Sequence, residues 1–209
     1  MRFALPVVLA AAVLLGGCEP IVGGPQASAP APAASAAAAQ LDALTVASPH
    51  SMSGYSRDRF PHWRRVDENC DTRDAVLKRD GTDVQATKTC KITKGSWYSA
   101  YDGKTYTDPD LIDIDHMVPL ADAWRSGADT WTDDQRTEFA NDLTRPQLIA
   151  VDASDNESKG DSSPDEWKPP NHGFWCTYAE DWVTVKTYWE LTVTRAEHDA
   201  LSDMLATCA

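Results

Sequence analysis

The sequence lacks the short motifs that mark several common classes of hydrolase. It contains no GxSxG turn for a nucleophilic serine, no HExxH helix for a catalytic zinc ion and no GxxxxGK loop for nucleotide phosphates. Its 5 cysteines include no CxxC pair and no cysteine–histidine spacing of the kind that binds structural zinc. Enzymes that depend on these motifs are therefore excluded as interpretations.

Basic residues are also scarce. There are 19 Lys and Arg against 32 Asp and Glu, which gives a formal net charge of -13. Affinity for phosphates comes mainly from Lys and Arg, so a nucleic-acid-binding protein with this charge must concentrate its basic residues or recruit metal ions. The most basic stretch is 55–80, which contains Arg57, Arg59, Arg64, Arg65, Arg73, Lys78 and Arg79. The acidity by itself also suits a soluble exported protein.

The N-terminus carries an apolar run that is too short to span a bilayer. Arg2 precedes the run from Phe3 to Leu15, a pattern typical of an export signal, here predicted at residues 1–17. Gly16 and Gly17 lead directly into Cys18, which resembles the lipobox of bacterial lipoproteins. Lipidation of Cys18 would anchor the protein at the outer face of a membrane. The alternative is ordinary signal cleavage further along the chain.

The cysteine count favours two disulfides. Five cysteines leave one over in an oxidising compartment, and Cys18 is the natural odd one. The other four, Cys70, Cys90, Cys176 and Cys208, permit three pairings. We favour Cys70 with Cys90 and Cys176 with Cys208, because each pair closes a short local loop.

The composition changes sharply along the chain. Residues 20–40 are uncharged and dominated by Ala, Pro, Ser and Gly, which predicts a disordered tether, set at residues 18–50. Residues 51–209 mix tryptophans, charges and turn residues, and a length of roughly 160 residues suits one domain with one core.

Hydrophobic periodicity predicts an α+β domain. Two or three short strands are expected within 82–106, with turns at Lys94-Gly95 and Asp102-Gly103. The expected elements after them are a strand at 111–116, helices at 120–127 and 132–142, a strand at 147–151, and helices at 152–159, 178–191 and 194–205. Thr194 and Glu197 form a capping box at the start of the last helix.

The strand LIDIDH places Asp113, Asp115 and His116 among apolar residues. A carboxylate buried without a partner costs several kcal/mol, so these groups must be paired, solvated or bound to a ligand. The stretch DIDHMVPL, followed about forty residues later by NESKGD, resembles the HNH nuclease family. In particular it is similar to a secreted branch whose domain also forms the C-terminal end of GmrSD-type restriction enzymes. The fragments CDTRDAVL, AWRSGA, FANDL and RPQLIAV agree with that branch, so the resemblance covers essentially 55–208.

The resemblance implies a ββα-metal core of the HNH or His-Me finger type, with flanking helices and short N-terminal strands. Phosphodiester cleavage needs a base to activate water and a cation to stabilise the departing oxygen. His116 is the candidate general base, because the pKa of imidazole lies closest to neutral pH. Asp115 and Asn156 are the candidate ligands, and their hard oxygen atoms suit Mg²⁺ or Mn²⁺.

Five further residues are assigned supporting roles. Gln147 takes the place of the family's middle Asn, which orients the histidine, and Asn141 is a weaker candidate. Lys159 is expected to contact phosphate or to cap its helix. Asp113 either orients a ligand or faces solvent, and Arg73 either reaches phosphate or forms a surface salt bridge.

The predicted function is that of an exported, metal-dependent endonuclease acting on nucleic acid, with DNA favoured over RNA. The alternatives are a non-catalytic surface lipoprotein that keeps the fold as a binding module, and a phosphodiesterase of small molecules. No protein partner is predicted. The 8 tryptophans are expected mostly in the core, and the remaining histidines (His50, His62, His172 and His198) are expected to be structural.

Overall fold

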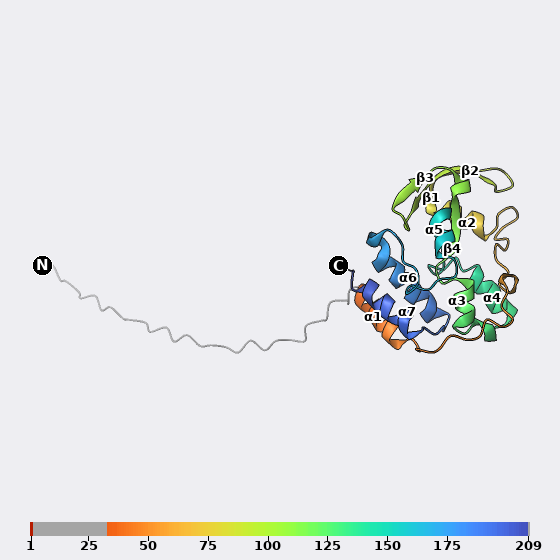
Figure 1. Cartoon of the computed structure of the whole chain (residues 1–209). Coiled ribbons are helices and arrows are strands. Elements are labelled where there is room, and N and C mark those ends of the chain that lie inside the picture. Colours follow the sequence, from red (N-terminus) through yellow and green to blue (C-terminus); the bar gives the residue numbers. More distant parts are fainter. Residues whose placement is uncertain (2–32, 209) are drawn as a thin grey trace. The chain divides into compact units, whose positions relative to one another are not determined.

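The computed structural model describes residues 33–208 together with Met1 (Figure 1). Apart from Met1, the predicted signal at 1–17, the lipidation site Cys18 and the tether up to residue 32 lie outside the described residues. The described part is a mixed α+β structure, as predicted. None of its helices combines the length and the apolar character that crossing a membrane requires.

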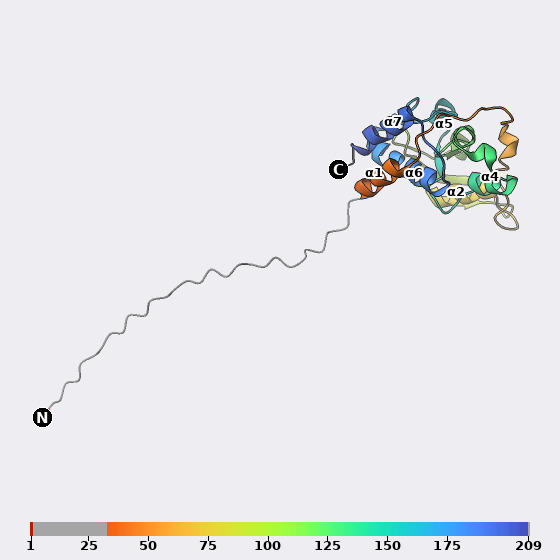
Figure 2. The ribbon, with the colours of Figure 1, turned by 90° about the horizontal axis from the view of Figure 1, so that it is seen from below.

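Helix α1 (Ala33–Ala43) is the first element of the described part, and it lies within the segment predicted to be a disordered tether. Ala37 and Leu41 are buried in the main core, and α1 contacts α6 (Trp175–Tyr188) and α7 (Arg195–Leu205) (Figure 2). The prediction of disorder is therefore wrong for residues 33–50. Alanine has the highest helix propensity, and its small side chain lets helices approach closely, so a composition typical of a linker forms a packed helix here.

A three-stranded antiparallel sheet follows helix α2 (Thr72–Asp80), with order β1 (Gly81–Ala86), β2 (Ile92–Ser99) and β3 (Lys104–Tyr106). The turn predicted at Lys94-Gly95 is wrong, because both residues lie within β2. A Cβ at Gly95 would lie 2.4 Å from the ring of Trp97, so this glycine permits close approach of a buried ring. The turn at Asp102-Gly103 is present, and Gly103 has φ +75°.

A second sheet holds the strand with the three titratable residues. Strands β4 (Ile112–His116) and β5 (Leu148–Asp152) are antiparallel, with Asp115 opposite Ile149 and His116 opposite Leu148. Strand β5 runs directly into α5 (Ala153–Lys159), where the Asp152 side chain caps the helix by accepting from Asp155 N. Helices α3 (Leu120–Arg125) and α4 (Asp133–Ala140) lie between the two strands in sequence.

The short 3-10 helices complete the described chain: η1 (Arg57–Arg59), η2 (Pro109–Leu111), η3 (Ala128–Thr130) and η4 (His172–Phe174). The capping box predicted at the start of α7 is confirmed, because the Thr194 side chain accepts from Glu197 N and the Glu197 side chain accepts from Thr194 N.

The β4–β5 hairpin lies between two hydrophobic clusters. Ile112 and Ile114 join a small cluster with α2 and Trp97, whereas Val151 belongs to the larger, mainly helical cluster. Trp97 and Trp182 are completely buried, as expected for packing residues. Since both sides of the hairpin are covered by cores, the backbone that carries Asp115 and His116 is rigidly held.

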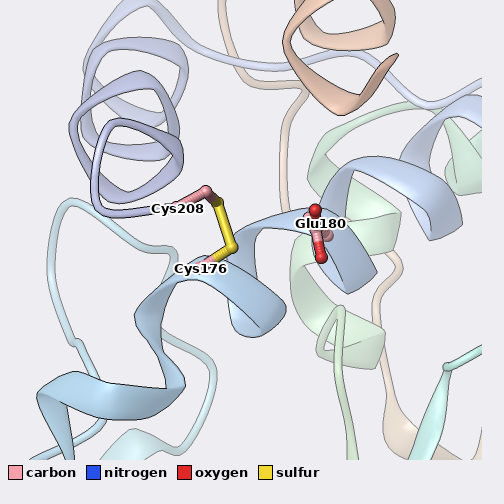
Figure 3. Close-up of side chains that lie close together, drawn as sticks. All are labelled: Cys176, Glu180 and Cys208. Atoms are coloured by element: carbon pink, nitrogen blue, oxygen red, sulfur yellow. A yellow bond between two sulfur atoms is a disulfide. The ribbon is translucent and has the colours of Figure 1, made fainter. Parts of the chain in front are cut away.

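Both predicted disulfides are present. Cys70–Cys90 joins the start of α2 to the turn between β1 and β2, with a Cα–Cα distance of 5.2 Å. Cys176–Cys208 joins α6 to the C-terminal end, with a Cα–Cα distance of 5.0 Å. Glu180 lies near this second bridge in Figure 3, but the two sulfur atoms are bonded to each other, so they are not thiolate ligands for a metal.

Candidate functional site

A small pocket gathers the three main predicted site residues. It has a volume of about 120 Å³ and lies beside the end of β4, the start of α3 and helix α5. Its lining consists of Arg57, Ile114, Asp115, His116, Pro119, Leu120, Asn156, Gly160 and Asp161. The candidate base and both candidate metal ligands therefore share one cavity.

Alternation along β4 places its two acids on the face opposite the small hydrophobic cluster. Successive strand residues face opposite sides, so Ile112 and Ile114 enter the small cluster, while Asp113 and Asp115 face α5. Asp113 Oδ2 accepts from Asn156 Nδ2 at 3.0 Å. Of the two alternatives for Asp113, the structure thus shows contact with the candidate ligand, and this bond leaves the Asn156 amide oxygen as the atom available for a cation.

Asp115 is only 6% exposed and is held by two donors. Its Oδ2 accepts from Lys159 Nζ at 2.7 Å and from the Tyr101 hydroxyl at 2.5 Å. Burial raises the pKa of Asp115, while the charge and hydrogen bond of Lys159 act in the opposite direction. Tyr101 could not be predicted from the sequence, because it belongs to the loop between β2 and β3 and contacts Asp115 only in the folded chain.

Lys159 does not have its expected role. Its side chain is completely buried, and Nζ also donates to the His116 backbone carbonyl at 2.9 Å. A phosphate outside the protein cannot reach this ammonium, and the ammonium does not cap α5. The expectation of phosphate contact or capping is therefore wrong, and Lys159 instead fixes the Asp115 carboxylate.

His116 is a buried, neutral imidazole. Its Nε2 lies 2.9 Å from the Ala140 carbonyl oxygen, which can only accept, so Nε2 carries the hydrogen and Nδ1 is left as the unprotonated atom. Burial lowers the pKa of His116 to about 3, although the bond to Ala140 opposes this shift. The ring is therefore neutral at pH 7 with a free lone pair on Nδ1, and the same shift makes it a weaker proton acceptor than an ordinary histidine.

The ring of Trp63 stacks on His116, with centroids 5.7 Å apart and planes inclined by 27°. Trp63 is half-buried and has φ +60°, a left-handed conformation that is rare for a bulky residue. His62, expected to be only structural, lies edge-on to His116, with 6.2 Å between the ring centroids. Strain of this kind persists where the surrounding structure enforces it, and here it places an aromatic wall beside the candidate base.

Gln147 does not orient His116. Its side chain exchanges two hydrogen bonds with Val118, Nε2 donating to the carbonyl at 2.9 Å and Oε1 accepting from the amide at 3.1 Å. The predicted role is wrong, because the Ala140 backbone carbonyl provides the contact to His116. Asn141, the weaker candidate, contributes indirectly: its amide binds Arg64 N and the Pro61 carbonyl and so ties the end of α4 to the preceding segment.

Arg73 also lies away from the pocket. Its guanidinium donates to the Ile112 carbonyl at 2.9 Å, at the opposite end of β4 from His116, so it has neither of its predicted contacts. The basic residue that does line the pocket is Arg57. The sequence marked the whole basic segment but offered no signal that singled out this arginine.

The donor set fits a small divalent cation. Asp115 supplies a carboxylate and Asn156 an amide oxygen at one pocket, and Mg²⁺ or Mn²⁺ commonly takes one or two such ligands while keeping several waters. The acids Asp102, Asp152 and Asp155 form another cluster outside this pocket, next to Lys104, which bonds Asp102 at 3.0 Å.

The family model described as GmrSD restriction endonucleases, C-terminal domain, matches residues 68–204. An uncharacterized secreted protein of Arthroderma benhamiae is 48% identical over 208 residues, covering 100% of both chains. No solved structure matches. The secreted relative agrees with the predicted export signal, but it is fungal, so the prediction of a bacterial lipoprotein is not supported.

Proposed function

Because the chain belongs to the family of GmrSD restriction endonuclease C-terminal domains, we propose that it is an exported, metal-dependent endonuclease of the HNH type. Its substrate would be the phosphodiester backbone of nucleic acid, with DNA favoured over RNA. The observation that carries this proposal is the single pocket lined by Asp115, His116 and Asn156. The order β4–β5–α5, two antiparallel strands followed by a helix, supports a ββα-metal core.

His116 would act as the general base. The Ala140 carbonyl holds its Nε2–H, so the free Nδ1 takes the proton of the attacking water. Burial keeps the ring unprotonated at neutral pH and lowers its basicity, so proton transfer to Nδ1 would depend on the bound cation acidifying the attacking water or stabilising the product. The stacked Trp63 limits rotation of the imidazole and excludes water from one of its faces.

Asp115 and Asn156 would hold Mg²⁺ or Mn²⁺, which when bound supplies positive charge to stabilise the departing oxygen. Lys159 and Tyr101 fix the Asp115 carboxylate through its Oδ2, and Asp113 fixes the Asn156 amide. These contacts prepare the ligand oxygens before any cation arrives, which reduces the cost of ordering them.

A phosphodiesterase of small molecules is the second candidate. The small pocket and the net charge of -13 favour it, because a long polyanion is repelled more strongly than a small diester. The non-catalytic binding module remains the alternative from another class.

The test compares two substrates with the chain lacking residues 1–17. Supercoiled plasmid and a chromogenic phosphodiester are incubated with Mg²⁺, Mn²⁺ or EDTA. We expect plasmid nicking that needs metal and falls steeply with salt. Activity only on the small diester, insensitive to salt, favours the second candidate. No activity on either substrate in any metal contradicts the enzyme proposal and leaves the binding module.

A further inference from the structure

We propose that Arg57 binds the substrate phosphate beside His116, so that a segment preceding the family domain completes the active site. This inference rests on the proposed nuclease function. The match to the family model covers residues 68–204, so Arg57 lies outside the matched part of the chain. Its side chain nevertheless lines the same pocket as Asp115, His116 and Asn156.

The pocket needs a cation that is free to meet a phosphate. Among its lining residues, Arg57 is the only Lys or Arg, while Asp115 and Asp161 are acidic. The nearby ammonium of Lys159 is buried and already bonded to Asp115 and to the His116 carbonyl. Because Lys159 already compensates Asp115, Arg57 is the lining residue whose charge can offset Asp161 and meet an anionic phosphate.

Most other arginines of the basic segment are committed elsewhere. Arg59 pairs with Asp133 at 3.7 Å, Arg64 pairs with Glu138, and Arg79 pairs with Asp80 at 2.6 Å. Within residues 33–208, the exposed side chain of Arg57 makes no ion pair and no hydrogen bond. Its five N–H donors are available, and their fork geometry suits two phosphate oxygens.

The backbone around Arg57 is anchored, so its position beside the pocket is part of the fold. Arg57 begins the 3-10 helix η1, and Phe60, which directly follows this helix, is completely buried against Phe139 and Trp124. The Arg59 carbonyl accepts from Arg136 Nε at 3.2 Å. A flexible arginine on a fixed base can reach a bound phosphate without reorganising the core.

The experiment compares Arg57→Ala and Arg57→Lys with Arg65→Ala, which removes an exposed arginine from the same segment but outside the pocket. Cleavage of a labelled 20-base-pair duplex is measured with Mn²⁺. We expect Arg57→Ala to lower kcat/KM about 10- to 100-fold, the loss typical of one charge-assisted hydrogen bond, and Arg57→Lys to recover part of it. Arg65→Ala should stay within about twofold of the wild type.

A second readout measures binding without cleavage. Fluorescence anisotropy of the same duplex with His116→Ala protein in EDTA is followed over a range of salt. Adding Arg57→Ala should reduce the slope of log K against log salt by about 1, because one fewer phosphate is neutralised. Adding Arg65→Ala should not change the slope. Circular dichroism and Tm confirm that each variant is folded.

The outcomes separate the two proposals. If the wild type cleaves and Arg57→Ala behaves like Arg65→Ala in both readouts, the inference about Arg57 is overturned and the nuclease function stands. If the wild type cleaves no substrate in any metal, the nuclease function fails, and the salt slope alone decides whether Arg57 binds phosphate. An unchanged slope then overturns the inference as well.

Discussion

The ammonium of Lys159 lies 2.7 Å from Oδ2 of Asp115, and both side chains are buried. Desolvation raises the pKa of Asp115, and the adjacent positive charge counteracts this shift, so the pair supports an ionised carboxylate beside the pocket. An ion pair at this depth is costly to break, because removal of one partner leaves a buried charge without compensation.

Replacement of Lys159 therefore tests a structural role. Lys159→Met keeps the length of the side chain and removes its charge, and we expect it to lower the free energy of unfolding by about 3 to 5 kcal/mol. Urea denaturation at pH 7 gives this value. Lys104→Met, which removes a solvent-exposed lysine that pairs with Asp102, serves as the control and should have a much smaller effect. Equal effects of the two changes would contradict the assigned role.

Acid should destabilise the protein through His116. The unfolded imidazole binds a proton near pH 6.5, whereas the folded one stays neutral down to about 3. Between these values the unfolded state binds one proton more, so stability falls as pH falls, by about 1.4 kcal/mol per pH unit for this group. Comparison of wild type with His116→Gln in urea from pH 7 to 4 isolates the contribution. If the unfolding free energies of the two proteins fell in parallel with pH, the pKa of His116 would not be lowered by folding.

Trp63 should influence the proton affinity of the base. Trp63→Ala opens one face of His116 to water, so the pKa of the imidazole should rise toward its ordinary value. The acidic limb of the pH–rate profile for plasmid nicking should then move to higher pH. Trp175→Ala removes another half-buried tryptophan from outside the pocket and should lower activity, if at all, without moving the limb. An unmoved acidic limb in Trp63→Ala would contradict the proposal that Trp63 shields the imidazole from water.

Helix α1 should be part of the stable domain. Leu41 is 2% exposed in the main core, so Leu41→Ala should cost about 2 to 5 kcal/mol of unfolding free energy. Leu143, which is 38% exposed, provides the matched control, and Leu143→Ala should cost much less. Urea denaturation of both variants measures the difference. If Leu41→Ala has no effect, α1 does not contribute to the core in solution.

The sequence predicted the elements that carry strong local signals. The alternation in LIDIDH, the capping box of Thr194 and Glu197 and the short cysteine spacings each correspond to a feature of the structure. The placement of Asp115, His116 and Asn156 at one pocket agrees with what the motif implied. Local patterning and motif spacing are properties of the chain itself, so they are accessible without coordinates.

The predictions that were wrong concern contacts that the pattern of side chains along the sequence does not determine. The partner of His116 is the Ala140 backbone carbonyl, and any residue at position 140 offers that group. From the sequence alone, Lys159 is expected at the surface, because its burial depends on contacts with Asp115 and the core that form only in the folded chain. Helix α1 was not predicted, because its alanine-rich composition is also typical of a linker. Its packing against α6 and α7 is what distinguishes it from one.

The most direct test of the account is the rate at which supercoiled plasmid is nicked in Mn²⁺ by wild type, His116→Ala and Asn156→Ala. The proposed pocket chemistry predicts metal-dependent nicking by the wild type and a loss of at least about 100-fold in each variant, provided that both remain folded. Wild-type rates in both folded variants would contradict the assignment of the pocket as the catalytic site.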